Sequence, residues 1–449
     1  MKTTSLFALA SSLFIPTLAL QNGVGRLPTL GYNTWNAYQC NIDEDLMLTT
    51  AQLMKSLGLQ VTIMSISTIA MRNATVAQTG ISLQASCSHM NRTVTSYFSN
   101  SSIISDKVRF KGGMKHLTDK IHALGFKTGI YSDSGWFTCA GYPGSFQNEL
   151  RDARTFQDWG FDYLKFDNCA IPYDSIIREG IVGKYKRMAD AIDTLSRTTG
   201  KRPLTFALCE WGWSQVWQWG KQFGQSWRTT GDIAPNWDSL ANIINFNSFI
   251  TQATDFFGRN DLDMLQLGNG NLTFDEAKSH FTAWALMKSP LLIGTNLSAI
   301  TDETLEILTN KEILAINQDP VVGASISPFR WGINPDWTSN SSFPAQYWSG
   351  ESQNGTVFML LNTLNAPADL TFNLTEPPWI RAGRAYSVRD LWTHTDNGTA
   401  VRNFTAHAVP PHGVVALLLR DAGDEPAGLF PECSVWWQCT DRNGTRVGG

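Results

Sequence analysis

Short apolar segments alternate with amphipathic ones from about residue 31 to residue 320. The segment 112–126 repeats its apolar residues with a helical period and ends near a glycine, and the apolar segment 127–133 that follows reads as a strand. The same pattern predicts helices over 151–161 and 185–200 and strands over 162–169 and 203–211. Repeated strand–helix units with polar residues at the strand ends predict a parallel sheet covered by helices.

An alternation of this length fits a (β/α)8 TIM barrel, an α/β fold whose chemistry lies at the carboxyl ends of the strands. A doubly wound open sheet is the alternative, but no glycine-rich phosphate-binding loop favours it. After about residue 322 strand-like segments follow one another without helices between them. We therefore predict a barrel over 21–322, a small antiparallel β-sandwich domain over 323–420 and a tail over 421–449.

Composition excludes two classes of partner. The chain has 449 residues, of which 43% are hydrophobic and 16% are charged, as in an ordinary globular protein. Its formal net charge of −4 and the lack of a Lys/Arg run give no basic field, so we expect neither nucleic acid nor a membrane surface as a partner. The 17 Trp permit stacking on sugars, although most of them will be core residues.

The first 20 residues resemble a secretory signal. Lys2 precedes an apolar run that is too short to span a bilayer, and Pro16 argues against a buried helix there. Several Asn-X-Ser/Thr triplets agree with export and N-glycosylation, among them those that begin at Asn271, Asn296, Asn354, Asn373, Asn397 and Asn403. The seven cysteines of an exported chain predict disulfides and leave at least one cysteine without a partner.

Two carboxylates are candidates for the chemistry. Asp167 ends the predicted strand 162–169 and shares its face with Lys165, a cation that favours the ionised carboxylate of a nucleophile. Asp232 follows Arg228 at another apparent strand end. Two carboxylates that face each other across a pocket permit acetal hydrolysis. The local alternatives are a loop-capping Asp and a surface ion pair.

Further polar residues at strand ends describe a sugar pocket. Glu210 stands between Cys209 and Trp211, and Asp261 and Asp263 end another apolar segment. No His/Cys cluster has metal-ligand spacing, and no Ser-His-Asp set is evident. We therefore expect neither a metal nor another cofactor.

Seven sequence blocks resemble the signature blocks of secreted α-galactosidases of glycoside hydrolase family 27, in family order. The blocks cover 30–40, 129–145, 162–169, 209–213, 226–233, 260–273 and 280–297. The resemblance implies a (β/α)8 barrel with a C-terminal β domain that hydrolyses terminal α-linked galactose with retention.

The resemblance also implies residue roles. Asp167 would be the nucleophile and Asp232 the acid/base. The residues that would hold galactose are Trp35, Tyr131, Lys165, Arg228 and Asp263, with Glu210 and Trp211 around the 2-hydroxyl. Cys139 and Cys169 would form a disulfide, and Cys209 would be a free buried thiol.

One segment departs from the family. Members carry a strand that reads Tyr-Val-Asn-Ile-Asp-Asp-Cys-Trp, whose two Asp bind the 4- and 6-hydroxyls of galactose and whose Cys pairs with the position of Cys40; nothing like it stands between Leu59 and Lys107. The genetic code permits codons for Val61 to Arg72 that encode a different peptide when translation starts one base earlier, at the last base of the Gln60 codon. That peptide is Gly-Tyr-Asn-Tyr-Val-Asn-Ile-Asp-Asp-Cys-Tyr-Ala. We hypothesise that residues 61–105 are a translation artefact, a frameshift near Gln60 followed by a retained intron.

The rival hypothesis is a genuinely divergent chain. Such a chain would lose a barrel strand and leave Cys40 unpaired, whereas a buried barrel strand over 61–70 would count against the artefact. Two functional alternatives follow: a catalytically dead sugar-binding glycoprotein on the same fold, and an α-N-acetylgalactosaminidase. The bulk of Glu210 and Trp211 disfavours the second.

Overall fold

Eight parallel strands form the first sheet of the computed structural model, which describes residues 22–59, 61–66, 71–72 and 103–429 together with Leu20 and Thr445. Bridges between Leu265, just after β9, and Ile293 of β10 close this sheet into a barrel. The predicted (β/α)8 barrel is therefore confirmed. In sheet order the strands are β10 (Leu291–Ile293), β1 (Leu30–Asn33), β2 (Ile63–Ile66), β5 (Lys127–Asp133), β6 (Tyr163–Asp167), β7 (Thr205–Leu208), β8 (Ser226–Arg228) and β9 (Arg259–Asp261).

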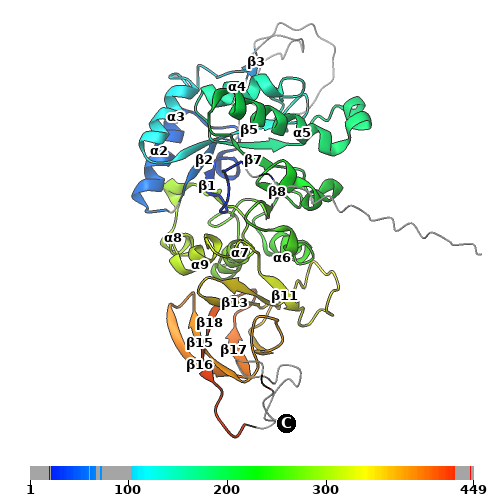
Figure 1. The fold of residues 1–449 in the computed structure, drawn as a ribbon. Helices are drawn as coiled ribbons and strands as arrows, with labels where there is room; N and C mark the ends of the chain where they lie inside the picture. The colour runs from blue at the N-terminus through cyan, green and yellow to red at the C-terminus, as the bar shows by residue number, and fades with distance from the viewer. Residues whose placement is uncertain are drawn as a thin grey trace, which may run out of the picture.

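Helices cover the outside of the barrel (Figure 1). Local signals start several of them: the Asp43 side chain caps α2 by accepting from Leu46 N, and Thr273 and Glu276 form a capping box at α7. The α-helices are α1 (Trp35–Tyr38), α2 (Glu44–Ser56), α3 (Met114–Ala123), α4 (Glu149–Asp158), α5 (Tyr173–Thr199), α6 (Trp237–Asn247), α7 (Phe274–Leu286), α8 (Asp302–Leu308) and α9 (Lys311–Asn317). Helix α5 begins 12 residues before the predicted 185–200 and bends at Gly180, whose φ is +69°.

Short 3-10 helices and a small ribbon complete the barrel domain. The 3-10 helices are η1 (Trp213–Gln218), η2 (Gly220–Gln222), η3 (Thr251–Ala253) and η4 (Leu297–Ala299), and the ribbon pairs β3 (Met71–Arg72) with β4 (Ile103–Ile104).

Strand β2 corrects one expectation. A genuinely divergent chain was expected to lose this strand, but Ile63–Ile66 pairs in parallel with both β1 and β5, and Met64 and Ser65 are fully buried. A parallel ladder bonds through the backbone alone, and β-branched residues such as Ile63 suit its pleated surface, so an unrelated sequence can complete it. This strand covers only 63–66 of the segment 61–70, so the artefact hypothesis stays a prediction. The remaining suspect residues 67–70 and 73–102, with Cys87, lie outside the described residues.

Eight antiparallel strands form the C-terminal domain, which is the predicted β-sandwich. In sheet order they are β11 (Ser327–Arg330), β12 (Tyr347–Ser352), β13 (Gly355–Leu361), β18 (Val414–Asp424), β15 (Arg384–Asp390), β16 (Thr395–Val401), β17 (Asn403–Val409) and β14 (Ala368–Asn373). The sandwich encloses a second core that includes Phe358, Phe372 and Leu417. Strand β18 runs four residues past the predicted limit of 420.

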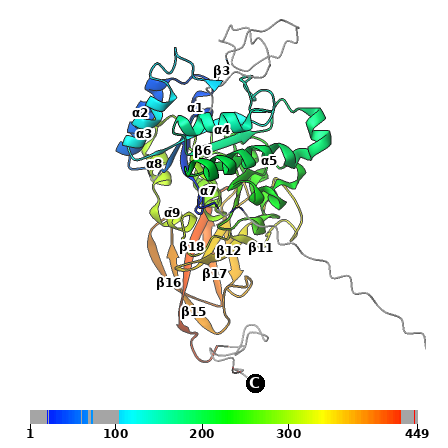
Figure 2. The same cartoon turned by 45° about the horizontal axis from the view of Figure 1, so that its top comes forward.

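Helix α7 joins the two domains. Ser279 Oγ donates to His412 O at 2.6 Å, and the indole of Trp392 donates to Thr282 Oγ1 at 2.9 Å. Both views place the sandwich and the ribbon of β3 at opposite ends of the molecule (Figures 1 and 2). None of the described helices is long and apolar enough to cross a bilayer. Residues 1–19 of the predicted signal (1–20) and most of the tail, with Cys433 and Cys439, lie outside the described residues.

Candidate active site

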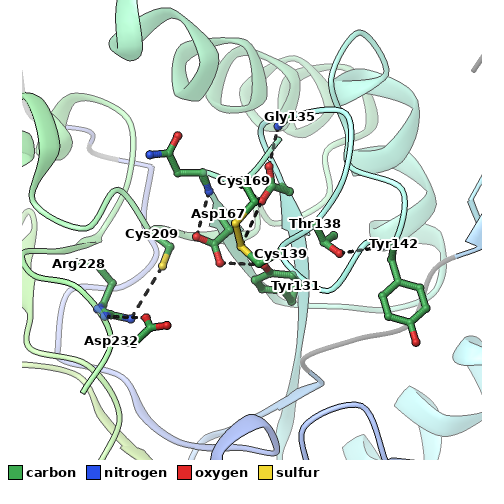
Figure 3. Close-up of a disulfide and its surroundings, with 12 residues drawn as sticks. Tyr131, Gly135, Thr138, Cys139, Tyr142, Asp167, Cys169, Cys209, Arg228 and Asp232 are labelled. Carbon is green, nitrogen blue, oxygen red and sulfur yellow. Dashed lines mark hydrogen bonds and ion pairs between the residues drawn. A yellow bond between two sulfur atoms is a disulfide. The ribbon is translucent and has the colours of Figure 1, made fainter. Parts of the chain in front are cut away.

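Asp167 ends β6 at the carboxyl end of the barrel, with Tyr131 and Lys165 beside it. The register pairs Tyr131 of β5 with Lys165 and places Asp167 opposite Asp133. The Tyr131 hydroxyl donates to Asp167 Oδ2 at 2.8 Å, and Asn168 N donates to Oδ1 at 3.0 Å (Figure 3). Asp167 is only 6% exposed. The two donors therefore fix the orientation of a buried carboxylate.

Asp133 is a site residue that sequence reasoning missed. Its carboxylate accepts from Gly135 N at 2.7 Å and from Cys169 N at 2.9 Å, and so ties the loops after β5 and β6 together. Burial, with the charge of Asp167 nearby, raises the pKa of Asp133 well above its usual range, and the two N–H donors oppose that rise. The signal was present, because Asp133 ends the predicted strand 127–133 just as Asp167 ends its own.

A disulfide joins the same two loops. Cys139 and Cys169 are bonded, with their Cα atoms 5.1 Å apart, as the resemblance implied (Figure 3). Asp133 and Asp167 lie so close that their carboxylates and the two sulfurs fall within 4.8 Å of one another. Sulfur atoms bonded to each other are not thiolate ligands, so this group offers a metal only carboxylates. Cys40 is also disulfide-bonded, so the expectation of an unpaired Cys40 is wrong.

Arg228, at the end of β8, holds two more acidic residues. Its Nη2 lies 3.2 Å from Asp232 Oδ1 and 2.8 Å from Asp263 Oδ2. Asp263 has φ of +79° and also accepts from Ile233 N at 2.9 Å. Arg228 and Asp263 are buried, whereas the Asp232 side chain is 84% exposed. The guanidinium therefore fixes Asp263 inside the pocket and leaves Asp232 open to solvent.

Cys209 stands between the two carboxylate groups. Its thiol is free and fully buried, and Arg228 Nη1 lies 3.9 Å from the sulfur. Burial, followed by the charge of Asp167, raises the pKa of Cys209 well above its ordinary value, so the thiol is neutral and inert. Figure 3 shows Asp167 and Asp232 on either side of this sulfur. Sequence reasoning treated Cys209 only as a buried thiol and did not place it between Asp167 and Asp232.

Two aromatic residues complete the predicted set. Trp35 opens α1 directly after β1, is half-buried, and its N–H donates to Asn33 Oδ1 at 2.9 Å. Trp211 follows β7, is half-buried and has φ of +58°, which is uncommon for a residue with a side chain. Both residues follow barrel strands at the catalytic end, where strained backbone is common in functional sites. Asp261, also predicted, is buried at the end of β9, where its carboxylate accepts from Asp263 N at 2.9 Å.

Comparison with known proteins identifies the family. Residues 27–319 match the family described as alpha galactosidase A, and residues 342–419 match the alpha galactosidase C-terminal beta sandwich domain. The chain belongs to glycoside hydrolase family 27, the α-galactosidases or melibiases. It is 38% identical to a probable alpha-galactosidase B of Talaromyces emersonii over 90% of this chain and 94% of that protein. The activity of this family is α-galactosidase activity, as the sequence blocks predicted for this chain.

Solved structures of α-galactosidases have the same fold as this chain. Alpha-galactosidase I from Mortierella vinacea superposes with a TM-score of 0.75 at 32% identity, over 91% of this chain and all of that one. The α-galactosidase of Saccharomyces cerevisiae, whose structure was determined with raffinose, gives a TM-score of 0.72 at 26% identity over 89% of this chain and 99% of that one.

Glu210 has a partner that the galactosidase motif did not reveal. Its side chain is fully buried, and Lys184 Nζ, from α5, lies 3.0 Å from Glu210 Oε2. The same ammonium donates to Asn168 Oδ1, next to Asp167. Burial raises the pKa of Glu210 to about 7, and the charge of Lys184 opposes the rise. The role of Glu210 at the 2-hydroxyl stays a prediction, since the structure pairs it with Lys184 beneath the pocket.

This pair leads to a stability prediction. Lys184→Met is expected to destabilise the fold by about 3–5 kcal/mol at roughly pH 8, because it leaves a buried carboxylate without a partner. Below pH 4.5, the ordinary pKa of Glu210, the loss is expected to be much smaller. Between pH 4.5 and pH 7, Glu210 is protonated in the folded protein and ionised in the unfolded chain. The contribution of the neutral Glu210 carboxyl to stability is therefore complete below pH 4.5 and is lost as the pH rises through 7.

Urea unfolding of the Lys184→Met variant at the two pH values measures this difference. Lys186→Met is the matched control, because Lys186 lies two residues along the same helix with a side chain that is 56% exposed. It should unfold like the parent chain. An equal effect of Lys184→Met at both pH values would show that Glu210 is not the group that Lys184 stabilises.

Proposed function

We propose that Asp167 and Asp232 perform retaining hydrolysis of terminal α-galactosides. The observation that carries this assignment is the contrast between the two carboxylates. Asp167 is buried and oriented by the Tyr131 hydroxyl, whereas Asp232 is exposed and held by a single contact with Arg228. A nucleophile needs a fixed position, and an acid/base needs access to the leaving group and to water.

The reaction then runs in two steps. A carboxylate oxygen of Asp167 attacks the anomeric carbon while the bond to the leaving oxygen breaks, and Asp232 gives that oxygen its proton. Water next attacks the anomeric carbon of the galactosyl ester, Asp232 accepts a proton from the water, and Asp167 leaves as a carboxylate. Galactose is released with the configuration it had in the substrate.

The remaining pocket residues would hold the galactose ring. Support comes from their placement: Lys165 and Tyr131 are neighbours across β5 and β6, and Asp263 is buried against Arg228. Charged hydrogen bonds to sugar hydroxyls are worth about 1.5–3 kcal/mol each, and those that tighten in the transition state raise the rate. Trp35 and Trp211 would offer apolar ring faces to the sugar.

The pocket of the chain as written lacks the acidic pair of the family. Strand β2 ends at Ile66, so the positions that the shifted reading frame fills with Asp are Thr68 and Ile69, directly past the carboxyl end of the strand. Thr68 and Ile69 themselves lie outside the described residues. With Thr68 and Ile69 present we expect little or no turnover, and a sugar-binding glycoprotein on the same fold is then the second candidate function.

Raffinose is a reasonable first substrate, since a relative's structure contains it. When the chain with residues 61–72 replaced, as described in the Discussion, cleaves raffinose, α-galactose is expected to appear first, followed by slow mutarotation, as proton NMR of the anomeric signals would show. If β-galactose appears first, the mechanism is inverting and the assignment of Asp167 as nucleophile is wrong.

Export and N-glycosylation are also part of the proposal. All six sequon asparagines named above are exposed in the structure, as glycan attachment requires. A loss of mass on enzymatic removal of N-glycans from the exported chain would support both statements, and an unchanged mass would contradict glycosylation.

A further inference from the structure

The loop after β7 carries four tryptophans, and one of them is unlike the others. Trp211, Trp217 and Trp219 are half-buried, whereas Trp213 is 51% exposed. The rings of Trp213 and Trp211 form a T-shaped pair, with centroids 5.4 Å apart and planes at 87°. About half of the Trp213 surface is therefore open to solvent, two residues past Trp211.

The loop that presents Trp213 is held on both sides. The ring of Trp217 packs against Phe246 of α6 at 5.4 Å, and the ring of Trp219 packs against Tyr185 of α5 at 5.8 Å. The Trp219 indole N–H also donates to Ser214 O at 3.0 Å. A fixed platform loses little conformational freedom when a ligand binds to it.

Backbone strain marks the same loop. Trp211, Ser214 and Gln215 have φ values of +58°, +51° and +53°, in a region that residues with side chains rarely adopt. Such strain persists where the surrounding structure imposes it, and it gathers at functional sites. The three strained residues lie on both sides of Trp213 in the chain.

The loop touches the segment that carries Asp232. Gly212 N donates to Arg228 O at 3.1 Å, and a β-carbon on Gly212 would lie 2.1 Å from Thr229 O, so only glycine allows this approach. Arg228 in turn contacts Asp232 at 3.2 Å. The acid/base protonates the oxygen of the leaving group, so the leaving group lies on the exposed side of Asp232. Trp213, which is exposed, follows Gly212 directly and so lies next to that segment.

We propose that Trp213 is the platform on which the leaving sugar stacks. The occupant is a hexopyranose, such as the glucose ring joined to galactose in raffinose, whose apolar face covers the indole. The inference rests on the proposed role of Asp232. It makes the enzyme selective for α-galactosides whose leaving group is a sugar ring over those whose leaving group is small.

The test compares two substrates that share galactose and differ in the leaving group. Trp213→Ala is expected to lower kcat/KM for raffinose roughly 3- to 10-fold, the range of an aromatic stacking contact, and to change kcat/KM for α-galactosyl fluoride much less. Trp213→Phe should keep most of the raffinose activity. The assay uses the chain with residues 61–72 replaced as described in the Discussion, alongside the chain as written.

Trp379→Ala is the matched control, because Trp379 is 43% exposed and lies in the C-terminal domain, between β14 and β15. An unchanged ratio of the two kcat/KM values in Trp213→Ala overturns the platform, and so does an equal fall for both substrates. Calorimetric affinities for raffinose and for galactose, in Asp167→Asn chains, give the same comparison without turnover. Because these affinities do not depend on turnover, they test the role of Trp213 even if the parent chain does not hydrolyse raffinose.

Discussion

In the chain with residues 61–72 replaced as described below, Asp167→Ala is expected to lower kcat on raffinose by roughly 10⁴-fold or more, because it removes the carboxylate that forms the galactosyl ester. Added azide should restore part of the rate. The shortened side chain leaves room for a small anion on the face of the sugar opposite the leaving group, where Asp167 stood beside Tyr131. Attack from that face produces β-galactosyl azide.

Asp232→Ala should give the opposite anomer. The galactosyl ester with Asp167 still forms from a substrate with a good leaving group, such as a nitrophenyl galactoside, but no base activates water for its hydrolysis. Azide needs no base, so it attacks the ester and produces α-galactosyl azide. The anomer of the trapped product, read by NMR, therefore assigns each carboxylate to its role.

The matched control for both variants is Asp174→Ala, an exposed aspartate in the first turn of α5. It should retain the parent activity and need no azide. If Asp167→Ala gives the α-azide, the two roles are reversed. If azide rescues neither variant while both unfold like the parent chain, Asp167 and Asp232 are not the reacting pair.

Restoring the family strand is expected to have the second large effect. Replacing residues 61–72 with Gly-Tyr-Asn-Tyr-Val-Asn-Ile-Asp-Asp-Cys-Tyr-Ala includes the substitutions Thr68→Asp and Ile69→Asp just beyond β2. Two charged hydrogen bonds to the 4- and 6-hydroxyls, at about 1.5–3 kcal/mol each, would raise kcat/KM roughly 10²- to 10⁴-fold. The measurement is hydrolysis of raffinose by the two chains at equal concentration.

The control keeps the new strand and removes only its charge. The same replacement with Thr68→Asn and Ile69→Asn has side chains of nearly the same shape, and it should gain little activity. Sequencing the mature transcript across codons 55 to 110 decides the origin of the segment. A transcript that matches the printed residues, together with no gain from the Asp pair, would refute the artefact hypothesis.

Strand β2 shows where reasoning from sequence alone failed. Motif comparison noticed that the acidic residues were missing and inferred that the strand was missing with them. The structure retains the strand, because its hydrogen bonds come from the backbone of β1 and β5 on either side. The side chains that follow the strand determine whether galactose binds, whereas the backbones of β1 and β5 determine whether the strand pairs.

The sequence by itself determined the barrel, the sandwich and the position of both carboxylates. Alternating apolar segments place strands and helices, and strand parity puts Lys165 and Asp167 on one face, since these are properties of consecutive residues. Only the tertiary structure placed Lys184 against Glu210, 26 residues apart in the chain, and left Trp213 exposed beside the segment of Asp232. Burial and partner choice depend on which elements pack together, and no local pattern encodes that packing.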